Sequence, residues 1–345
     1  MARKLSQYNK LIPYIKRHFR ALYPALTPYK ILNISGALVD MKLRRKKCSS
    51  RPFMYSIDPS SVCNLRCPPC ESHKEVTRKK RIMDYQDFVV IIDKIKNVAL
   101  GAALFDAGEP FLNKDIYKMI GRCKRNRIST VISTNFNTDI DYVSLINNGL
   151  TSLEPCLDGF SQEAYSYYRV GGDVEKVKRN IEKMVETKKK LKSAYPIIDV
   201  QVIEFKHIKK EMKQIKEYLQ KIEVDNVTFR KENSGFDNNA AVKRKKRKDM
   251  CFWLYLGMMV RPDGSVYPCC SRGLNRFSYG SLITQDLSEI WNNKYYIFSR
   301  ELFTEGKTLV VDEDLARVPC LKCTDFKIKR KIKIINKSDQ SIKTN

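Results

Sequence analysis

The sequence predicts an α/β fold with a parallel sheet, followed by a small domain built from a hairpin and a helix. Between residues 51 and 235, apolar runs of strand length alternate with segments of helical periodicity. A polar, basic stretch at residues 236–250 then interrupts this alternation. Beyond it, the turn-forming sequence Pro262-Asp263-Gly264 separates two short apolar runs, as expected of a β-hairpin. A chain of 345 residues has room for two such units.

The first fifty residues form a basic N-terminal extension. Apolar residues recur at helical spacing from Leu11 to Leu22, with cations on the other side, which predicts a short amphipathic helix. Pro24 and Pro28 are expected to end it. Such a helix could pack on the main domain, or it could contact a membrane surface or a partner.

The alternation from residue 51 onward defines the predicted core at residues 51–235. Six strands are expected, at Phe53–Asp58, Ala102–Ala107, Ile128–Ser133, Ser152–Asp158, Ile197–Phe205 and Val224–Arg230. Five helices are expected between them, at Asp84–Lys96, Lys114–Cys123, Ile140–Asn147, Val174–Leu191 and Lys209–Lys221. Strands that alternate with helices favour a parallel sheet, either open or closed into a barrel, with functional residues in the loops after the strands.

The second domain is expected at residues 251–325. The runs Met258–Arg261 and Val266–Tyr267 flank the predicted turn, and Leu287–Trp291 has the pattern of a short helix. Residues 326–345 form a basic tail.

The net charge of +27 is concentrated at the two ends of the chain. Residues 1–52 carry 13 Lys/Arg and one Asp, and residues 324–345 carry seven Lys/Arg and two Asp. This excess could serve an anionic membrane surface or another polyanion. Nucleic acid is not an expected partner, because no aromatic and basic RNA-binding signature accompanies the charge. Because lysines interrupt the first twenty residues, no secretory signal is expected, and a cytoplasmic location follows.

A cysteine-rich loop follows the first predicted strand. The segment from Cys63 to Cys70 reads CNLRCPPC and places three thiols within eight residues. Soft thiolate ligands select zinc or an iron–sulfur cluster. Closed sites take four protein ligands, so either His73 supplies a fourth or one metal position stays open for chemistry.

This loop resembles that of the radical S-adenosylmethionine (radical SAM) enzymes, which carry CxxxCxxC after the first strand. The resemblance implies a partial (β/α)6 TIM-like barrel in which Cys63, Cys67 and Cys70 hold a [4Fe–4S] cluster, so that His73 is not a ligand. S-adenosylmethionine would bind the fourth iron, and a donor such as flavodoxin or ferredoxin would supply an electron. The cofactor is then cleaved to a 5′-deoxyadenosyl radical that removes a hydrogen atom from the substrate.

A second motif of the family follows the second strand. Residues 106–110 read DAGEP and resemble the GGE motif, with Ala107 in place of the first glycine. The resemblance implies that Gly108 and Glu109 meet the methionyl amino group.

Further cofactor contacts are expected after the third and fourth strands. Asn135 and Asn137 match polar positions that face the ribose in the family. Arg169 matches an arginine near the methionyl carboxylate, where a guanidinium fork suits a carboxylate.

A second set of cysteines lies in the small domain. By ligand count alone, Cys251, Cys269, Cys320 and Cys323 could hold zinc or a second iron–sulfur cluster. Their order resembles the auxiliary-cluster domains called SPASM and, in a shorter form, Twitch. A full SPASM domain uses more cysteines for two clusters, so the resemblance implies one auxiliary [4Fe–4S] cluster here. Cys270 is spare and could replace Cys269.

The resemblance implies an oxidoreductase-like enzyme with an open choice of substrate. One auxiliary cluster suits oxidation or epimerisation of a small molecule such as a sugar, an aminocyclitol or a carrier-linked saccharide, with the cluster accepting an electron. The alternatives are a maturase that modifies a peptide or protein, and a non-enzymatic metal-binding protein that contacts nucleic acid. No catalytic residue is assigned, although Tyr267, Asp158 and Glu204 are possible bases.

Overall fold

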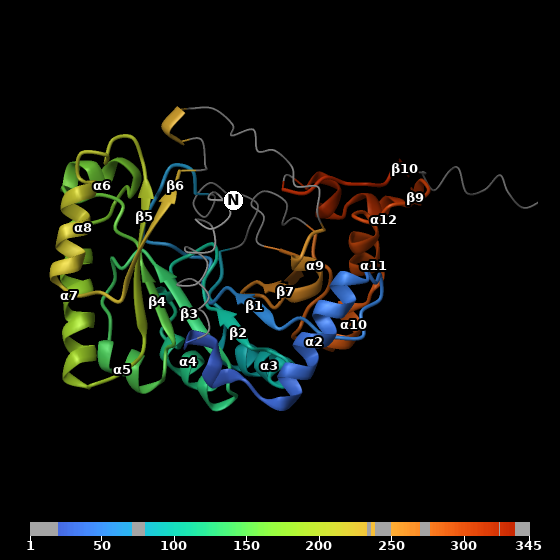
Figure 1. Ribbon diagram of the computed structural model, residues 1–345, viewed down its shortest axis with the longest axis horizontal. Coiled ribbons are helices and arrows are strands. Elements are labelled where there is room, and N and C mark those ends of the chain that lie inside the picture. Colours follow the sequence, from blue (N-terminus) through green and yellow to red (C-terminus); the bar gives the residue numbers. More distant parts are fainter. Residues whose placement is uncertain are drawn as a thin grey trace, which may run out of the picture.

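A single mixed sheet forms the centre of the protein (Figure 1). The computed structural model describes residues 20–70, 80–232, 236–238, 250–269, 277–323 and 325–334. Eight strands are arranged in the order β6-β5-β4-β3-β2-β1-β7-β8. They are β1 (Met54–Ile57), β2 (Gly101–Ala103), β3 (Ser129–Thr134), β4 (Ser152–Pro155), β5 (Ile197–Glu204), β6 (Asn226–Lys231), β7 (Gly257–Val260) and β8 (Val266–Tyr267). Every neighbouring pair is parallel except β7 and β8, which form the predicted hairpin.

The α/β fold class is confirmed. Strands β1 to β6 occupy the six predicted positions in sequence order, and five predicted helices connect them on the outer side of the sheet (Figure 1). These are α3 (Tyr85–Ile95), α4 (Ile116–Arg125), α5 (Tyr142–Asn147), α7 (Val174–Lys190) and α8 (Met212–Lys221). In α3, Asp84 caps the first turn, and Phe88, Ile91 and Ile95 lie on the buried face.

Several elements were not predicted from the sequence, and α2 (Pro28–Lys42) is the longest of them. Pro28 was expected to end a helix, but it begins this one, because proline is favoured at the first helical position. Thr27 caps the helix by accepting a hydrogen bond from the N–H of Lys30. The predicted helix from Leu11 lies mostly outside the described residues, which begin at residue 20.

The other missed elements are short. They are α6 (Gln162–Tyr168), α9 (Trp253–Leu256), α11 (Lys294–Glu301), α12 (Glu313–Ala316), β9 (Leu309–Val311) and β10 (Ile332–Ile334), whereas α10 (Leu287–Trp291) has its predicted bounds. Elements of three to eight residues span two turns of periodicity at most, so the sequence carries little signal for them. No helix among the described residues has the length and apolar character needed to cross a bilayer.

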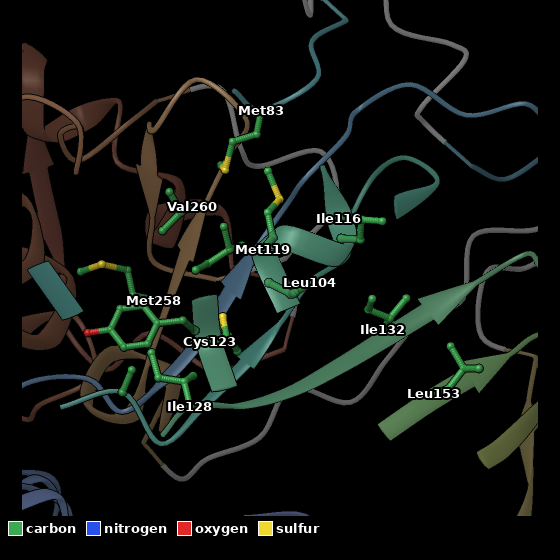
Figure 2. Packing of buried hydrophobic residues seen from close by; sticks show 14 of the residues in the cluster. Met83, Leu104, Ile116, Met119, Cys123, Ile128, Ile132, Leu153, Met258 and Val260 are labelled. Carbon is green, nitrogen blue, oxygen red and sulfur yellow. The ribbon is translucent and has the colours of Figure 1, made fainter. Parts of the chain in front are cut away.

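The small domain continues the sheet and the core of the larger one. Residues Met54 to Ile57 of β1 pair in parallel with Gly257 to Val260 of β7. Figure 2 shows Met258 and Val260 of β7 packed in one hydrophobic cluster with Met119 of α4 and with Ile128, which directly precedes β3. The polar run 243–248 between the two units lies outside the described residues.

Arg300 of α11 connects several chain segments through hydrogen bonds inside the small domain. It is fully buried and lies against the ring of Trp291. Its guanidinium donates to the carbonyl oxygens of Leu254, Trp291 and Lys46 and to Oδ1 of Asn292. A single cation therefore satisfies acceptors from α9, from α10 and from the segment after α2, which fixes their positions.

Candidate functional site

The cysteine loop starts at the carboxyl end of β1, next to the loops that follow β2, β3 and β4. Cys67 is buried, and Cys63 and Cys70 are partly exposed. The N–H of Cys70 donates to the carbonyl oxygen of Cys67, which folds the loop back on itself. The pKa of the Cys63 thiol is raised to about 11, chiefly by burial and in smaller part by Glu109, Cys67 and Cys70, while a hydrogen bond from the N–H of Leu65 opposes the rise.

The DAGEP loop approaches the cysteine loop so closely that only glycine fits at residue 108. A Cβ on Gly108 would lie 2.0 Å from the carbonyl oxygen of Ser60 and 2.5 Å from that of Val62. The next N–H, that of Glu109, donates to Val62 O at 2.8 Å. Gly108 is therefore required by the contact between two loops rather than by a turn of its own.

Glu109 joins the loop after β2 to the loop after β3. Its carboxylate is almost completely buried and accepts from the hydroxyl of Thr134 at 2.7 Å, the N–H of Asn135 at 2.9 Å and the N–H of Phe111 at 3.2 Å. Burial raises the pKa of Glu109, and these three hydrogen bonds oppose the rise. The carboxylate is thus held in one orientation beside the cysteine loop.

The two candidate asparagines have different surroundings. The side-chain amide of Asn135 donates to Asn64 Oδ1 at 2.9 Å and lies 3.7 Å from Cys63 Sγ. Asn137 instead donates to the hydroxyl of Tyr165 at 2.7 Å and accepts from the N–H of Asp173. Asn135 therefore lies at the sulfurs, whereas Asn137 ties its loop to α6 and to the start of α7.

Arg169 lies between a buried carboxylate and the cysteine loop. Its Nε and Nη2 contact Asp158 Oδ2 at 2.7 Å and 2.5 Å, and its Nη1 lies 3.8 Å from Cys67 Sγ. Asp158 is fully buried and also accepts from the N–H of Ile203. Asp158 thus orients the guanidinium, which places a fixed positive charge next to a thiol.

These residues form a site at one edge of the sheet that fits an iron–sulfur cluster. Three soft donors, Cys63, Cys67 and Cys70, come from one short loop, and a cation and an amide face two of their sulfurs. Within the described part of the chain, no three His, Cys, Asp or Glu side chains are grouped closely enough for a single metal ion. A cluster distributes its thiolates over different irons, so its ligands stand further apart than those of one ion.

The second set of cysteines gathers in the small domain. Cys251 and Cys320 are buried, and the pKa of Cys251 is raised to about 12, chiefly by burial and in smaller part by Cys320 and Cys323. The hydroxyl of Tyr279 lies 3.6 Å from Cys320 Sγ, and the N–H of Phe326 donates to Cys323 Sγ at 3.3 Å.

The fourth cysteine of this set comes from the end of the hairpin. The thiols of Cys320 and Cys269 both lie near the hydroxyl of Tyr296, where they raise its pKa, although burial is the larger cause. Cys270, the alternative ligand, and His73 of the first loop lie outside the described residues. Four thiols from two places suit a closed site.

A buried ion-pair cluster joins β7 of the small domain to the loops after β1 and β2, and it was not predicted from the sequence. Arg261, directly after β7, pairs with Asp106 of the DAGEP loop at 2.7 Å and with Asp58, directly after β1, at 3.5 Å. Burial raises the pKa of Asp58, Asp106 raises it further, and Arg261 opposes the rise. The available signal in the sequence was a charged residue directly after each strand. This signal could be used only once the pairing of β1 with β7 was known.

Two of the possible bases, Asp158 and Glu204, lie on neighbouring chain segments, because Asp158 accepts from the N–H of Ile203, the residue before Glu204. Asp158 is ion-paired with Arg169, the guanidinium of Arg261 lies 5.9 Å from the ring centre of Tyr267, and Glu204 ends β5.

The three other cysteines behave as packing residues: burial raises the pKa of Cys48 to about 11, of Cys123 to about 12 and of Cys156 to about 11.

Comparisons with curated proteins find relatives in one part of the chain. A probable GTP 3′,8-cyclase of Methanococcus vannielii is 29% identical over 137 residues, 39% of this chain and 45% of the relative. A GTP 3′,8-cyclase of Clostridium botulinum is 31% identical over 126 residues, 35% of this chain and 40% of the relative. The chain thus spans less than half the length of the curated relatives it matches.

Solved structures resemble this chain over most of its length. SuiB of Streptococcus suis bound to the precursor peptide SuiA has a TM-score of 0.62 at 15% identity, covering 88% of this chain and 77% of SuiB. Native anSMEcpe with bound AdoMet has a TM-score of 0.56 at 17% identity, covering 81% of this chain and 93% of anSMEcpe. At these identities the likeness establishes the fold.

Two family descriptions match the two units of the structure. Residues 57–218, from β1 to α8, match the radical SAM superfamily, whose cores bind a [4Fe–4S] cluster and S-adenosylmethionine. Residues 251–324, which include β7, β8 and the second cysteine set, match the iron–sulfur cluster-binding SPASM domain. The chain therefore belongs to the radical SAM enzyme family and carries a C-terminal SPASM domain.

Proposed function

We propose that this chain cleaves S-adenosylmethionine reductively and uses the resulting radical to oxidise or epimerise a small molecule. The observation that carries the proposal is the convergence of the cysteine loop with Gly108, Glu109 and Asn135 at the carboxyl ends of β1, β2 and β3. When bound, the cluster and cofactor supply an electron and a 5′-deoxyadenosyl radical that takes a hydrogen atom. The reaction would take place in the cytoplasm with a flavodoxin- or ferredoxin-like donor.

The residues of the chain hold and orient the cofactor in this proposal. Glu109 is buried and has three donors, so it offers a preorganised carboxylate to an ammonium group without a reorganisation cost. Asn135 offers an amide at the edge of the cysteine loop. Arg169 keeps one guanidinium nitrogen toward the site, while Asp158 holds the other two. Asn137 acts through the position of its loop.

The second cysteine set supports an electron-accepting role for the small domain. Removing a hydrogen atom and then a proton from an alcohol leaves a substrate radical that must lose one more electron to become a ketone. One auxiliary cluster on Cys251, Cys269, Cys320 and Cys323 would accept that electron. In an epimerisation, the substrate radical regains a hydrogen atom instead, and no net electron is lost.

A peptide or protein substrate is the second candidate. The structural likeness to SuiB, which was solved with a precursor peptide, favours it. A purely metal-binding, nucleic-acid-contacting role has the charge of the chain ends as its only support.

The proposal is tested by anaerobic reconstitution followed by a single-turnover assay. Two [4Fe–4S] clusters predict about eight irons per chain and no zinc. Dithionite and S-adenosylmethionine should then yield 5′-deoxyadenosine in the wild type. The variant C67A should yield none, and C123A, which changes a core thiol away from both sets, should match the wild type. Zinc uptake without iron, or equal 5′-deoxyadenosine from C67A, would refute the radical reaction.

The substrate class is tested with deuterium. Pools of sugars and aminocyclitols, and separately pools of peptides, are supplied with exchange-inert C–D bonds. Deuterium in 5′-deoxyadenosine from the first pools alone supports the proposal, whereas deuterium from peptides alone establishes the second candidate.

A further inference from the structure

Helix α2 presents an apolar stripe to solvent. Ile31, Leu32, Leu38, Val39 and Leu43 are between 46% and 69% exposed. At 100° per residue they fall within a sector about 140° wide, on the side opposite the buried Ala37 and Asp40. In Figure 1, α2 lies at the periphery, in blue, between the labels of α3 and α10. Five large apolar side chains in one exposed stripe mark an interaction surface.

The buried side of α2 fixes the helix firmly to the protein. The side chain of Asn33 exchanges two hydrogen bonds with the backbone of Arg51, at 2.9 Å and 3.0 Å. Asp40 accepts from both the N–H and the hydroxyl of Ser50. The apolar stripe is therefore the solvent-facing side of a helix that is packed on the protein, rather than a core face that has lost its packing.

Positive charge lies at the carboxyl end of the helix. Lys42, Arg44, Arg45, Lys46 and Lys47 are all exposed, and the one acid of residues 28–47, Asp40, is buried. Arg45 pairs with Asp40, and Lys46 pairs with Glu301. The exposed surface of this segment is thus apolar along the helix and cationic after it, with no acidic side chain.

A cationic cavity lies at the amino end of the same helix. It has a volume of about 220 Å³, and its lining includes Thr27 and Lys30 of the helix start, Lys96 after α3, and Asn126 and Arg127 after α4, with no acid. Lys96 also pairs with Asp93 outside the cavity. The buried Lys30 ammonium donates to the carbonyl oxygens of Asn126 and Arg127. Its pKa is lowered to about 8, by burial first and by Arg127 second. An anion here would restore the lost solvation of the ammonium.

We propose that α2 docks this protein on an anionic phospholipid bilayer, with the apolar stripe among the headgroups and the cations at both ends of the helix on lipid phosphates. Interfacial helices lie in the membrane plane with this division between apolar insertion and basic flanks. Each basic residue near an anionic leaflet adds attraction that salt weakens. This inference does not depend on the proposed reaction.

Charge favours a bilayer over the other possible occupants. A symmetric contact between two copies through the stripe would place the basic segment of one α2 against a cationic end of the other, whether the helices run parallel or antiparallel. Residues 1–19 carry five Lys/Arg and no acid, so their charge disfavours contact with the cationic ends of α2. A leaflet rich in phosphates complements both ends of the helix.

The experiment is vesicle co-sedimentation of the full chain. Vesicles of phosphatidylcholine alone are compared with vesicles that contain one third phosphatidylglycerol. The wild type should pellet with the anionic vesicles only, and less so as salt is raised. L32Q/V39Q should lower the partition coefficient by about tenfold or more, because two inserted apolar side chains are lost. The matched control V143Q changes a valine on α5 with the same 47% exposure as Val39 and should bind like the wild type.

The cavity is tested by a second matched pair. Arg127 and Lys192 are exposed cations with positive φ angles of 51° and 48°, a conformation that asparagine accepts. R127N should lower anionic-vesicle binding severalfold, and K192N should not. Circular dichroism checks that all four variants keep the wild-type melting temperature.

Three results would overturn the proposal. The first is equal binding of the wild type and L32Q/V39Q, and the second is equal binding to neutral and anionic vesicles. The third is a wild-type dimer in sedimentation velocity that L32Q/V39Q dissociates while vesicle binding is unchanged, which would assign the stripe to a second copy.

Discussion

Replacing Arg261 with methionine should destabilise the junction between the two units strongly. Arg261 is 7% exposed, and it is ion-paired with Asp106 at 2.7 Å and with Asp58 at 3.5 Å. R261M keeps most of the side-chain volume but leaves two poorly hydrated carboxyl groups facing each other. Breaking a buried pair in this way costs about 3–5 kcal/mol of unfolding free energy. R261K, which keeps a point charge but loses the fork, should cost less.

The loss of unfolding free energy caused by R261M should depend on pH. In the unfolded chain, Asp58 ionises near pH 4 (about 3.9). Its folded pKa is raised, so over the window from that value up to the folded pKa the native state holds a proton that the unfolded state has released. The free energy of unfolding therefore falls as pH rises through the window. R261M removes the cation that opposes the rise, so it raises the folded pKa of Asp58 above the wild-type value of about 8, and its cost in unfolding free energy should be larger at pH 9 than at pH 6.

Urea denaturation at both pH values measures the effect, with slopes compared to confirm that the same surface unfolds. The double variant R261M/D106N supplies the coupling energy. Because D106N removes one of the opposed carboxylates, the double variant should be more stable than the sum of the two single changes predicts. The reasoning fails if R261M costs less than about 1 kcal/mol, or if its deficit is the same at both pH values.

Three further outcomes follow from the site and the small domain. C67A should lose about four of about eight irons and leave the auxiliary cluster in place, measured by iron analysis and Mössbauer spectroscopy. E109Q should raise the dissociation constant for S-adenosylmethionine about 30-fold in equilibrium dialysis. The amide places a donor against the N–H of Asn135, and a charge-assisted hydrogen bond is lost. An unchanged dissociation constant would contradict the role of Glu109 in holding the cofactor. R300M should lower the unfolding free energy by about 3–5 kcal/mol, because it removes a buried cation that donates to the carbonyl oxygens of Leu254, Trp291 and Lys46, whereas R125M on the exposed end of α4 should be neutral in the same melt.

The regular part of the fold could be predicted because its signals are local. The strands and helices between residues 51 and 235 follow from periodicity, and the hairpin follows from Pro262-Asp263-Gly264. Helix α2 could not be recognised in this way. Its outward face is apolar and its inward face includes Lys30, Asn33 and Asp40, which reverses the usual pattern. An inverted pattern of this kind is itself a sign of function.

The candidate site was predictable by residue type but not by contact. The cysteine spacing and the DAGEP sequence named two loops that the structure brings into contact through Val62 and Glu109. The sequence could not reveal that Gly108 is demanded by the carbonyl oxygens of Ser60 and Val62, or that Asn137 faces Tyr165 rather than the sulfurs. These are consequences of how loops from separate strands approach one another, and no local pattern records such an approach.

The pairing of β7 with β1 has a consequence for electron transfer. Cys63 follows the carboxyl end of β1, and Cys251 precedes the amino end of β7 by one helical turn, so adjacent strands of one sheet position the first cysteine set and Cys251 of the second. Swinging the small domain away would break the backbone hydrogen bonds of this pair. With clusters bound as proposed, the tunnelling distance between them is therefore set by the backbone and is not adjustable by domain motion. The rate of electron transfer would then be governed by the two reduction potentials and by the presence of substrate.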